Sequence, residues 1–144
     1  MNFLPSRATL HFLAATTLLA VAATAQTTRI HRSVFTGVGN PSSAVQGVTN
    51  LLGSFSGTGS IVGQTPTGDL LGVFNWGGAN SLSGSFQLTL GMMLSPGVFL
   101  FTEQVQVTGG SGLYANATGT EFAVGVINLA TSQFAGVGRG VVTY

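Results

Sequence analysis

The chain has 144 residues, of which only 5% are charged, with a formal net charge of +1 and no cysteine. This scarcity of basic residues excludes recognition of nucleic acid, or of an anionic membrane surface, through clustered positive charge. The lack of cysteine excludes disulfides and thiolate metal sites, and the few widely spaced His, Asp and Glu residues predict no metal site of any other kind.

Residues 1–25 have the pattern of a secretory signal peptide. Arg7 supplies a positive charge, residues 10–21 are mostly apolar, and the tripeptide Ala23-Thr24-Ala25 provides the small residues that precede a cleavage site. The apolar run is shorter than the roughly 20 residues of a membrane-spanning helix. We therefore expect cleavage after Ala25, one mature domain over residues 26–144, and a secreted or periplasmic location.

The remaining chain alternates apolar and polar residues with a period of two, which is typical of half-buried β-strands. Turn signals rich in Gly, Pro, Asn and Ser separate the segments. The eight segments expected to form strands are, in chain order, 29–37, 52–63, 69–76, 82–90, 98–108, 113–119, 120–129 and 134–143. Only residues 42–51 could hold a short helix, and Gly47 weakens it. The short, even spacing predicts an all-β fold, a single eight-stranded antiparallel β-barrel after the signal peptide.

A short pattern, F-x-G-x-G, occurs three times, at residues 35–39, 55–59 and 134–138. In a strand, the aromatic ring and both glycines face the same side. Two missing side chains let the strand bend sharply, or let another side chain lie over it, as the corners of a barrel require.

Glu103 is the first of two weak candidates for a catalytic residue. In a regular strand over residues 98–108 it shares a face with Phe99, Phe101 and Val105. If that face is interior, burial raises the pKa of the carboxyl group, which can then act as an acid or a base. The alternative is that a bulge near Thr102 turns Glu103 toward solvent.

His31 is the second candidate, because it is the only histidine after the predicted leader. It shares a face with Phe35, although a position at the start of a strand favours the rim of the barrel. With so few titratable groups, no catalytic residue is assigned, and a binding protein is favoured over an enzyme. The side chains expected to line an interior pocket are Phe35, Phe86, Phe99, Phe101 and Val105.

Residues 108–119 read TGGSGLYANATG, and Gly109, Gly110 and Gly112 predict a tight, glycine-dependent structural turn. The stretch 109–119 resembles the G-G-T-G-x-F-x-x-A-x-G motif of the dirigent proteins and the allene oxide cyclase-like barrels. Residues 134–138 resemble the closing strand of the same group.

The resemblance covers roughly the last third of the chain, and Ser111, Tyr114 and Thr118 depart from the family's pattern. It implies an eight-stranded barrel with a central apolar pocket, often trimeric, that works without a cofactor on a reactive hydrophobic ligand. The balance of charges after the leader also favours self-association. No site residue of the family maps onto this chain.

Three functions remain open. A secreted barrel that binds a small hydrophobic ligand is favoured, and a cofactor-free cyclase- or dirigent-like enzyme using Glu103 and His31 is the first alternative. A structural or outer-membrane barrel is the second, because Val142 and Tyr144 resemble the aromatic end of such proteins, but the outward faces lack a continuous bulky apolar band. Large side chains that point inward would favour the first two functions.

Overall fold

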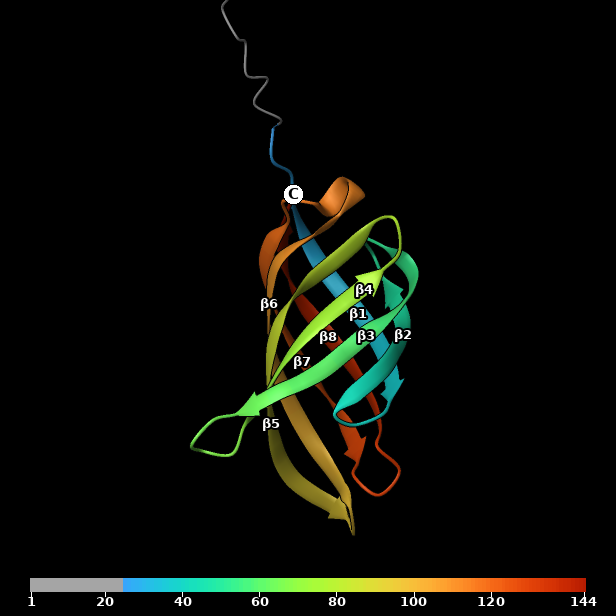
Figure 1. Cartoon of the computed structure of the whole chain (residues 1–144), viewed down its shortest axis with the longest axis vertical. Helices are drawn as coiled ribbons and strands as arrows, with labels where there is room; N and C mark the ends of the chain where they lie inside the picture. Colours follow the sequence, from blue (N-terminus) through green and yellow to red (C-terminus); the bar gives the residue numbers. More distant parts are fainter. Residues whose placement is uncertain (1–24) are drawn as a thin grey trace, which may run out of the picture.

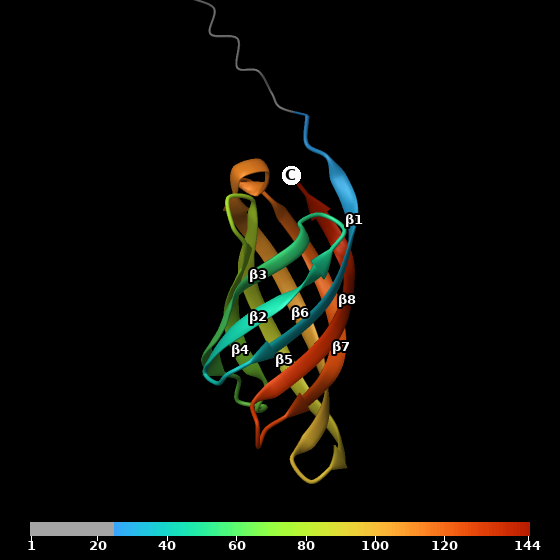
Figure 2. The same ribbon diagram turned by 90° about the vertical axis from the view of Figure 1, so that its right-hand side faces the viewer.

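The structure is a computed structural model that describes residues 25–144. The predicted leader therefore lies outside the described residues, except for Ala25. Eight antiparallel strands form a closed barrel in which each strand pairs with its neighbours in sequence and β1 pairs with β8 (Figures 1 and 2). The elements are β1 (Thr28–Val38), β2 (Ser42–Thr49), β3 (Gly53–Gln64), β4 (Leu70–Gly77), β5 (Ser81–Ser95), β6 (Val98–Ser111), the 3-10 helix η1 (Gly112–Tyr114), β7 (Thr118–Asn128) and β8 (Gln133–Thr143).

The up-and-down order gives the barrel two different ends. The terminal end carries the start of β1, the end of β8, the β2–β3 and β4–β5 turns, and η1 (Figure 1). The opposite end carries the four remaining turns, and the long β5–β6 hairpin projects from it (Figure 2). Within residues 25–144, no helix is long and apolar enough to cross a membrane.

The predicted barrel is confirmed, but two of the predicted segments are wrong. Residues 42–49, considered for a helix, form β2, whose inward positions include Ser43, Gly47 and Thr49. These small or polar residues conceal the apolar alternation of a strand. Residues 113–119 do not form a strand, because the chain turns through η1 and β7 begins only at Thr118. One strand was missed and another was wrongly predicted, so the predicted number of strands is still correct.

Aromatic rings in the interior lie over glycines of the neighbouring strand. Phe35 pairs in register with Gly136 of β8, and Phe134 of β8 pairs with Gly37 of β1. A methyl group added to either glycine would collide with the partner's ring. The same relation holds for Phe86 over Gly72 and for Phe101 over Gly125. Glycine thus provides the space that lets large rings fill a narrow barrel.

The glycine-rich segment closes the terminal end. Gly110 approaches the backbone of Ser81 too closely for any side chain, and Gly112 has a φ of 57°, in the left-handed region. Gly109 and Gly110 both lie within β6, so the predicted turn begins only at Gly112, and a side chain at Gly109 would make only ordinary contacts. This path carries Tyr114 into the barrel, where its hydroxyl donates a hydrogen bond of 2.8 Å to the carbonyl of Leu51.

Candidate functional site

The barrel encloses a cavity of about 90 Å³. Turn residues Gly39, Asn40, Leu129 and Ser132 are among those that line it, so the cavity reaches toward the opposite end of the barrel. A water molecule takes about 30 Å³ in the liquid, so roughly three would fill this volume. The space therefore suits a small molecule.

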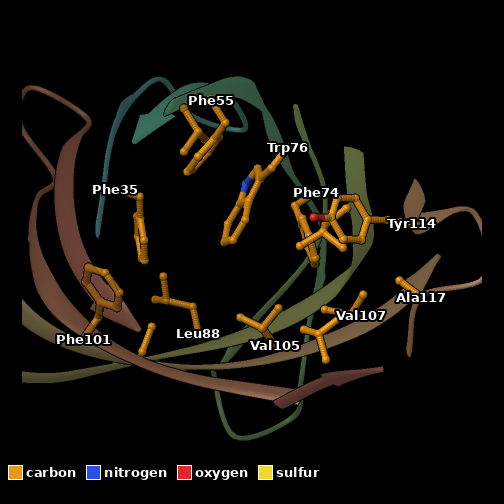
Figure 3. Packing of buried hydrophobic residues seen from close by; sticks show 14 residues of the cluster. Phe35, Phe55, Phe74, Trp76, Leu88, Phe101, Val105, Val107, Tyr114 and Ala117 are labelled. Atoms are coloured by element: carbon orange, nitrogen blue, oxygen red, sulfur yellow. The ribbon is translucent and has the colours of Figure 1, made fainter. Parts of the chain in front are cut away.

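Aromatic side chains dominate the wall of the cavity. Trp76 projects into the middle of the barrel, with its ring centroid 4.6 Å from that of Phe74 and 5.3 Å from that of Phe55 (Figure 3). The aromatic residues that line the cavity are Phe35, Phe74, Trp76, Phe86, Phe101 and Phe134. Their aliphatic companions include Val45, Ile61, Leu70, Leu88 and Ile127.

Of the five residues expected in a pocket, Phe35, Phe86 and Phe101 line the cavity. Val105 is buried in the core without lining it, and Phe99 is only partly buried. Trp76 and Phe74 were not among the residues expected in the pocket, although both lie on a segment predicted to be a strand. Alternation along a strand shows which residues share a face, but it does not show how far their rings lie from those of other strands.

Glu103 is the one charged residue in the wall of the cavity, and 6% of its surface is exposed. β6 pairs with β7 from Val98 to Val107 without a register shift, so no bulge turns Glu103 outward. Burial, and secondarily the nearby charge of Glu121, raise the pKa of Glu103 from its ordinary value of 4.5 to about 7. The carboxyl group can therefore gain or lose a proton near neutral pH.

A polar cluster of three side chains, His31, Ser33 and Glu121, lies deeper in the barrel, toward the terminal end. Nδ1 of His31 is 2.7 Å from Oε2 of Glu121, and the hydroxyl of Ser33 donates a hydrogen bond of 2.5 Å to Oε1 of the same carboxylate. All three residues are almost completely buried. The contact between His31 and Glu121 is close, but it lacks the geometry of a hydrogen bond.

The backbone register explains why these residues meet. His31 of β1 and Glu121 of β7 are both register partners of Gly140 on the intervening strand β8. One row further along, Ser33 is opposite Gly138, where a methyl group would overlap the Glu121 carboxylate and the Ser33 hydroxyl. The absence of a side chain at Gly138 thus leaves the space that the cluster occupies, whereas Gly140 lets the backbone of β7 approach β8 closely.

Glu103 connects this cluster to the cavity. On the paired strands β6 and β7, Glu103 is opposite Ala123 and Val105 is opposite Glu121. The two carboxyl groups are therefore diagonal neighbours on one inner face. Diagonal positions of this kind are within reach of long side chains. Glu121 follows the same alternation as Ala123 within β7, so the argument made for Glu103 would also have identified Glu121 as an inward carboxylate.

Arg29, a cation on β1, is exposed at the terminal end and forms no ion pair with Glu103. Among residues 25–144, the ion pair that forms is His31–Glu121. In the same part of the chain, no three His, Asp or Glu residues gather closely enough to hold a metal ion. No family model, curated protein or solved structure matches the chain.

Proposed function

We propose that this barrel is an exported protein that binds a small hydrophobic ligand in its interior. The observation that carries the proposal is the cavity of about 90 Å³, walled by aromatic and aliphatic side chains with the Glu103 carboxyl group as its charged member. A concave apolar site with few polar groups is the usual form of a small-molecule site.

The direction of the aromatic side chains supports this function over a role as an outer-membrane barrel. The rings of Phe35, Phe74, Trp76 and Phe101 are buried inside, whereas Phe122 is the one aromatic residue among the large exposed apolar side chains described. Barrels of the outer membrane have the reverse arrangement, with a polar interior and aromatic girdles facing lipid.

Fluorescence of Trp76 tests ligand binding directly, because it is the single tryptophan of the chain and lines the cavity. We expect toluene, a small apolar probe, to change this fluorescence saturably. Gly59 also lines the cavity, and a Cβ there would make only ordinary contacts, so Gly59→Val fills the space without a clash at the backbone. This variant should lose the response.

Gly63→Val is the matched control, because Gly63 lies on the same strand with open space around it. It should bind toluene as the unmodified protein does. Equal responses from both variants would show that toluene binds outside the cavity, and no saturable response from the unmodified protein would contradict a purely apolar ligand.

A cofactor-free enzyme of the cyclase or dirigent type is the second candidate, favoured by one observation. The carboxyl group of Glu103 is in the cavity wall with a pKa of about 7, which suits proton transfer at neutral pH. Exchange of the α-hydrogens of cyclopentanone for deuterium in D₂O, followed by NMR, tests this activity. Catalysed exchange that disappears in Glu103→Gln would support it, and exchange at the rate of buffer alone would contradict it.

A further inference from the structure

The charges inside the barrel do not balance. Two carboxyl groups, those of Glu103 and Glu121, are buried, and His31 is the one buried residue of the described part that can carry a positive charge. His31 lies against Glu121. The three arginines of residues 25–144, Arg29, Arg32 and Arg139, are all exposed. Ionised Glu103 therefore has no cation of its own.

The wall around Glu103 is well suited to a cation. Six of the cavity-lining residues are aromatic. The face of an aromatic ring carries a partial negative charge and attracts an ammonium group, with a gain of about 2 kcal/mol or more where water is excluded. A buried carboxylate close to such rings adds a full opposite charge in a medium of low dielectric constant. A purely hydrocarbon ligand would use neither feature.

We propose that the ligand of this cavity carries a small alkylammonium group, held by the Glu103 carboxylate and the surrounding aromatic rings. This inference rests on the proposed function, since it concerns the same cavity and defines the chemistry of its ligand. The apolar part of the ligand would pack on the aliphatic wall, and its cationic head would supply the missing positive charge.

Binding exchanges one proton for one cation. With a pKa of about 7, Glu103 of the free protein is largely protonated below neutral pH, and the ammonium ligand displaces that proton into solvent without any other bond changing. The charged group that acts on Glu103 is Glu121 from β7, which is itself in contact with His31 and Ser33 from β1. Its register partner on β5 is Leu88, and β8 presents Gly138 in the same row, so neither strand adds a charge there.

Choline and 3,3-dimethylbutan-1-ol provide a matched pair of probes, since they differ chiefly in a positive nitrogen that replaces a neutral carbon. Binding of each to the unmodified protein is measured by Trp76 fluorescence and calorimetry between pH 5 and pH 8. With a pKa of about 7 for Glu103, the ionised fraction predicts an increase of about 90-fold in choline affinity over this range. The neutral alcohol should bind more weakly at pH 8 and show no such increase.

Glu103→Gln tests the residue itself. This variant should lose the pH dependence of choline binding and at least about tenfold of its affinity at pH 8, while its affinity for the neutral alcohol is retained. Circular dichroism checks its fold, and the comparison of the two probes on the unmodified protein does not depend on it.

The possible results separate the two proposals. Equal affinity for choline and the alcohol at every pH would overturn the cationic ligand but support an apolar binding cavity. Binding of choline that Gly59→Val leaves unchanged would also overturn the inference, because the cation would then lie elsewhere. Failure of choline, the alcohol and toluene to bind would overturn both proposals.

Discussion

His31 and Glu121 contact each other across an intervening strand. Nδ1 of the imidazole is 2.7 Å from Oε2 of the carboxylate, although β8 separates the two strands that carry them. Gly140 is the register partner of both residues and has no side chain to keep them apart. The polar interior of this barrel therefore depends on glycines of β8 as much as on the titratable residues themselves.

Gly138→Ala should destabilise the protein through the polar cluster. The added methyl group would overlap the Glu121 carboxylate and the Ser33 hydroxyl, both of which are almost completely buried. Overpacking combined with disruption of a buried ion pair predicts a loss of about 3 kcal/mol in the free energy of unfolding. Urea denaturation followed by circular dichroism measures this loss.

Gly63→Ala is the control for that substitution, because nothing lies within 4 Å of the added methyl group. Its effect should remain within about 0.5 kcal/mol. A similar loss in both variants would show that the cost arises from replacing any strand glycine, and not from the cluster.

Glu103→Gln should leave the fold intact and stabilise it at neutral and alkaline pH. Burial raises the pKa of Glu103 from 4.5 to about 7 in the folded protein, so the folded state binds more protons than the unfolded state between these values. The stability of the unmodified protein must therefore fall as the pH rises from about 4.5 to 7. At 1.36 kcal/mol per pKa unit, the fall attributable to Glu103 is on the order of 3 kcal/mol.

The variant lacks this titration. Its free energy of unfolding should therefore exceed that of the unmodified protein by an amount that grows from about pH 4.5 to 7 and levels off above pH 7. Urea denaturation at a series of pH values measures the difference, and a carboxyl NMR titration gives the pKa of Glu103 independently. A difference in stability that does not change with pH, or an ordinary glutamate pKa, would contradict the burial of this group.

The pairing of rings with glycines predicts a strong coupling between Gly37 and Phe134. Gly37→Ala places a methyl group in the ring of Phe134, and we expect a loss of about 2 kcal/mol. Phe134→Ala removes the ring and opens a space, so the two substitutions combined should cost less than the sum of the two alone. A double-mutant cycle should give a coupling energy of about 1–3 kcal/mol, and additive effects would contradict the contact.

Self-association, expected from the sequence, should involve the outer face of β1 and β8. Val48, Val34, Val137 and Val124 form a row across the adjacent strands β2, β1, β8 and β7, and each is between 45% and 57% exposed. Removing one buried valine from an interface costs about 1.5 kcal/mol, so Val34→Lys should raise the dissociation constant by tenfold or more.

Light scattering of the purified protein at micromolar concentration measures this association, with a trimer as the state that the family resemblance implies. Val62→Lys, on an exposed position of β3 outside the row, is the control and should associate normally. A monomeric mass for the unmodified protein would contradict the expectation.

The sequence by itself determined the class of fold and the side on which several key residues lie. Regular alternation from Phe99 to Val107 placed Glu103 on the face of these apolar residues, with a bulge near Thr102 as the open alternative. The F-x-G-x-G pattern indicated either a sharp bend or a side chain lying over the missing ones. Alternation works because successive side chains of a strand point to opposite faces, a local property of the backbone. It failed for β2, where inward Ser43, Gly47 and Thr49 carry no apolar signal.

Only the tertiary structure decided which inward residues meet. His31 and Glu121 are 90 positions apart in the numbering of the chain, and their contact depends on the register of β8 against both β1 and β7. The cavity likewise depends on how Trp76 and the surrounding phenylalanines fill the barrel across several strands. Register and packing are set by many side chains acting together, so no local pattern contains them.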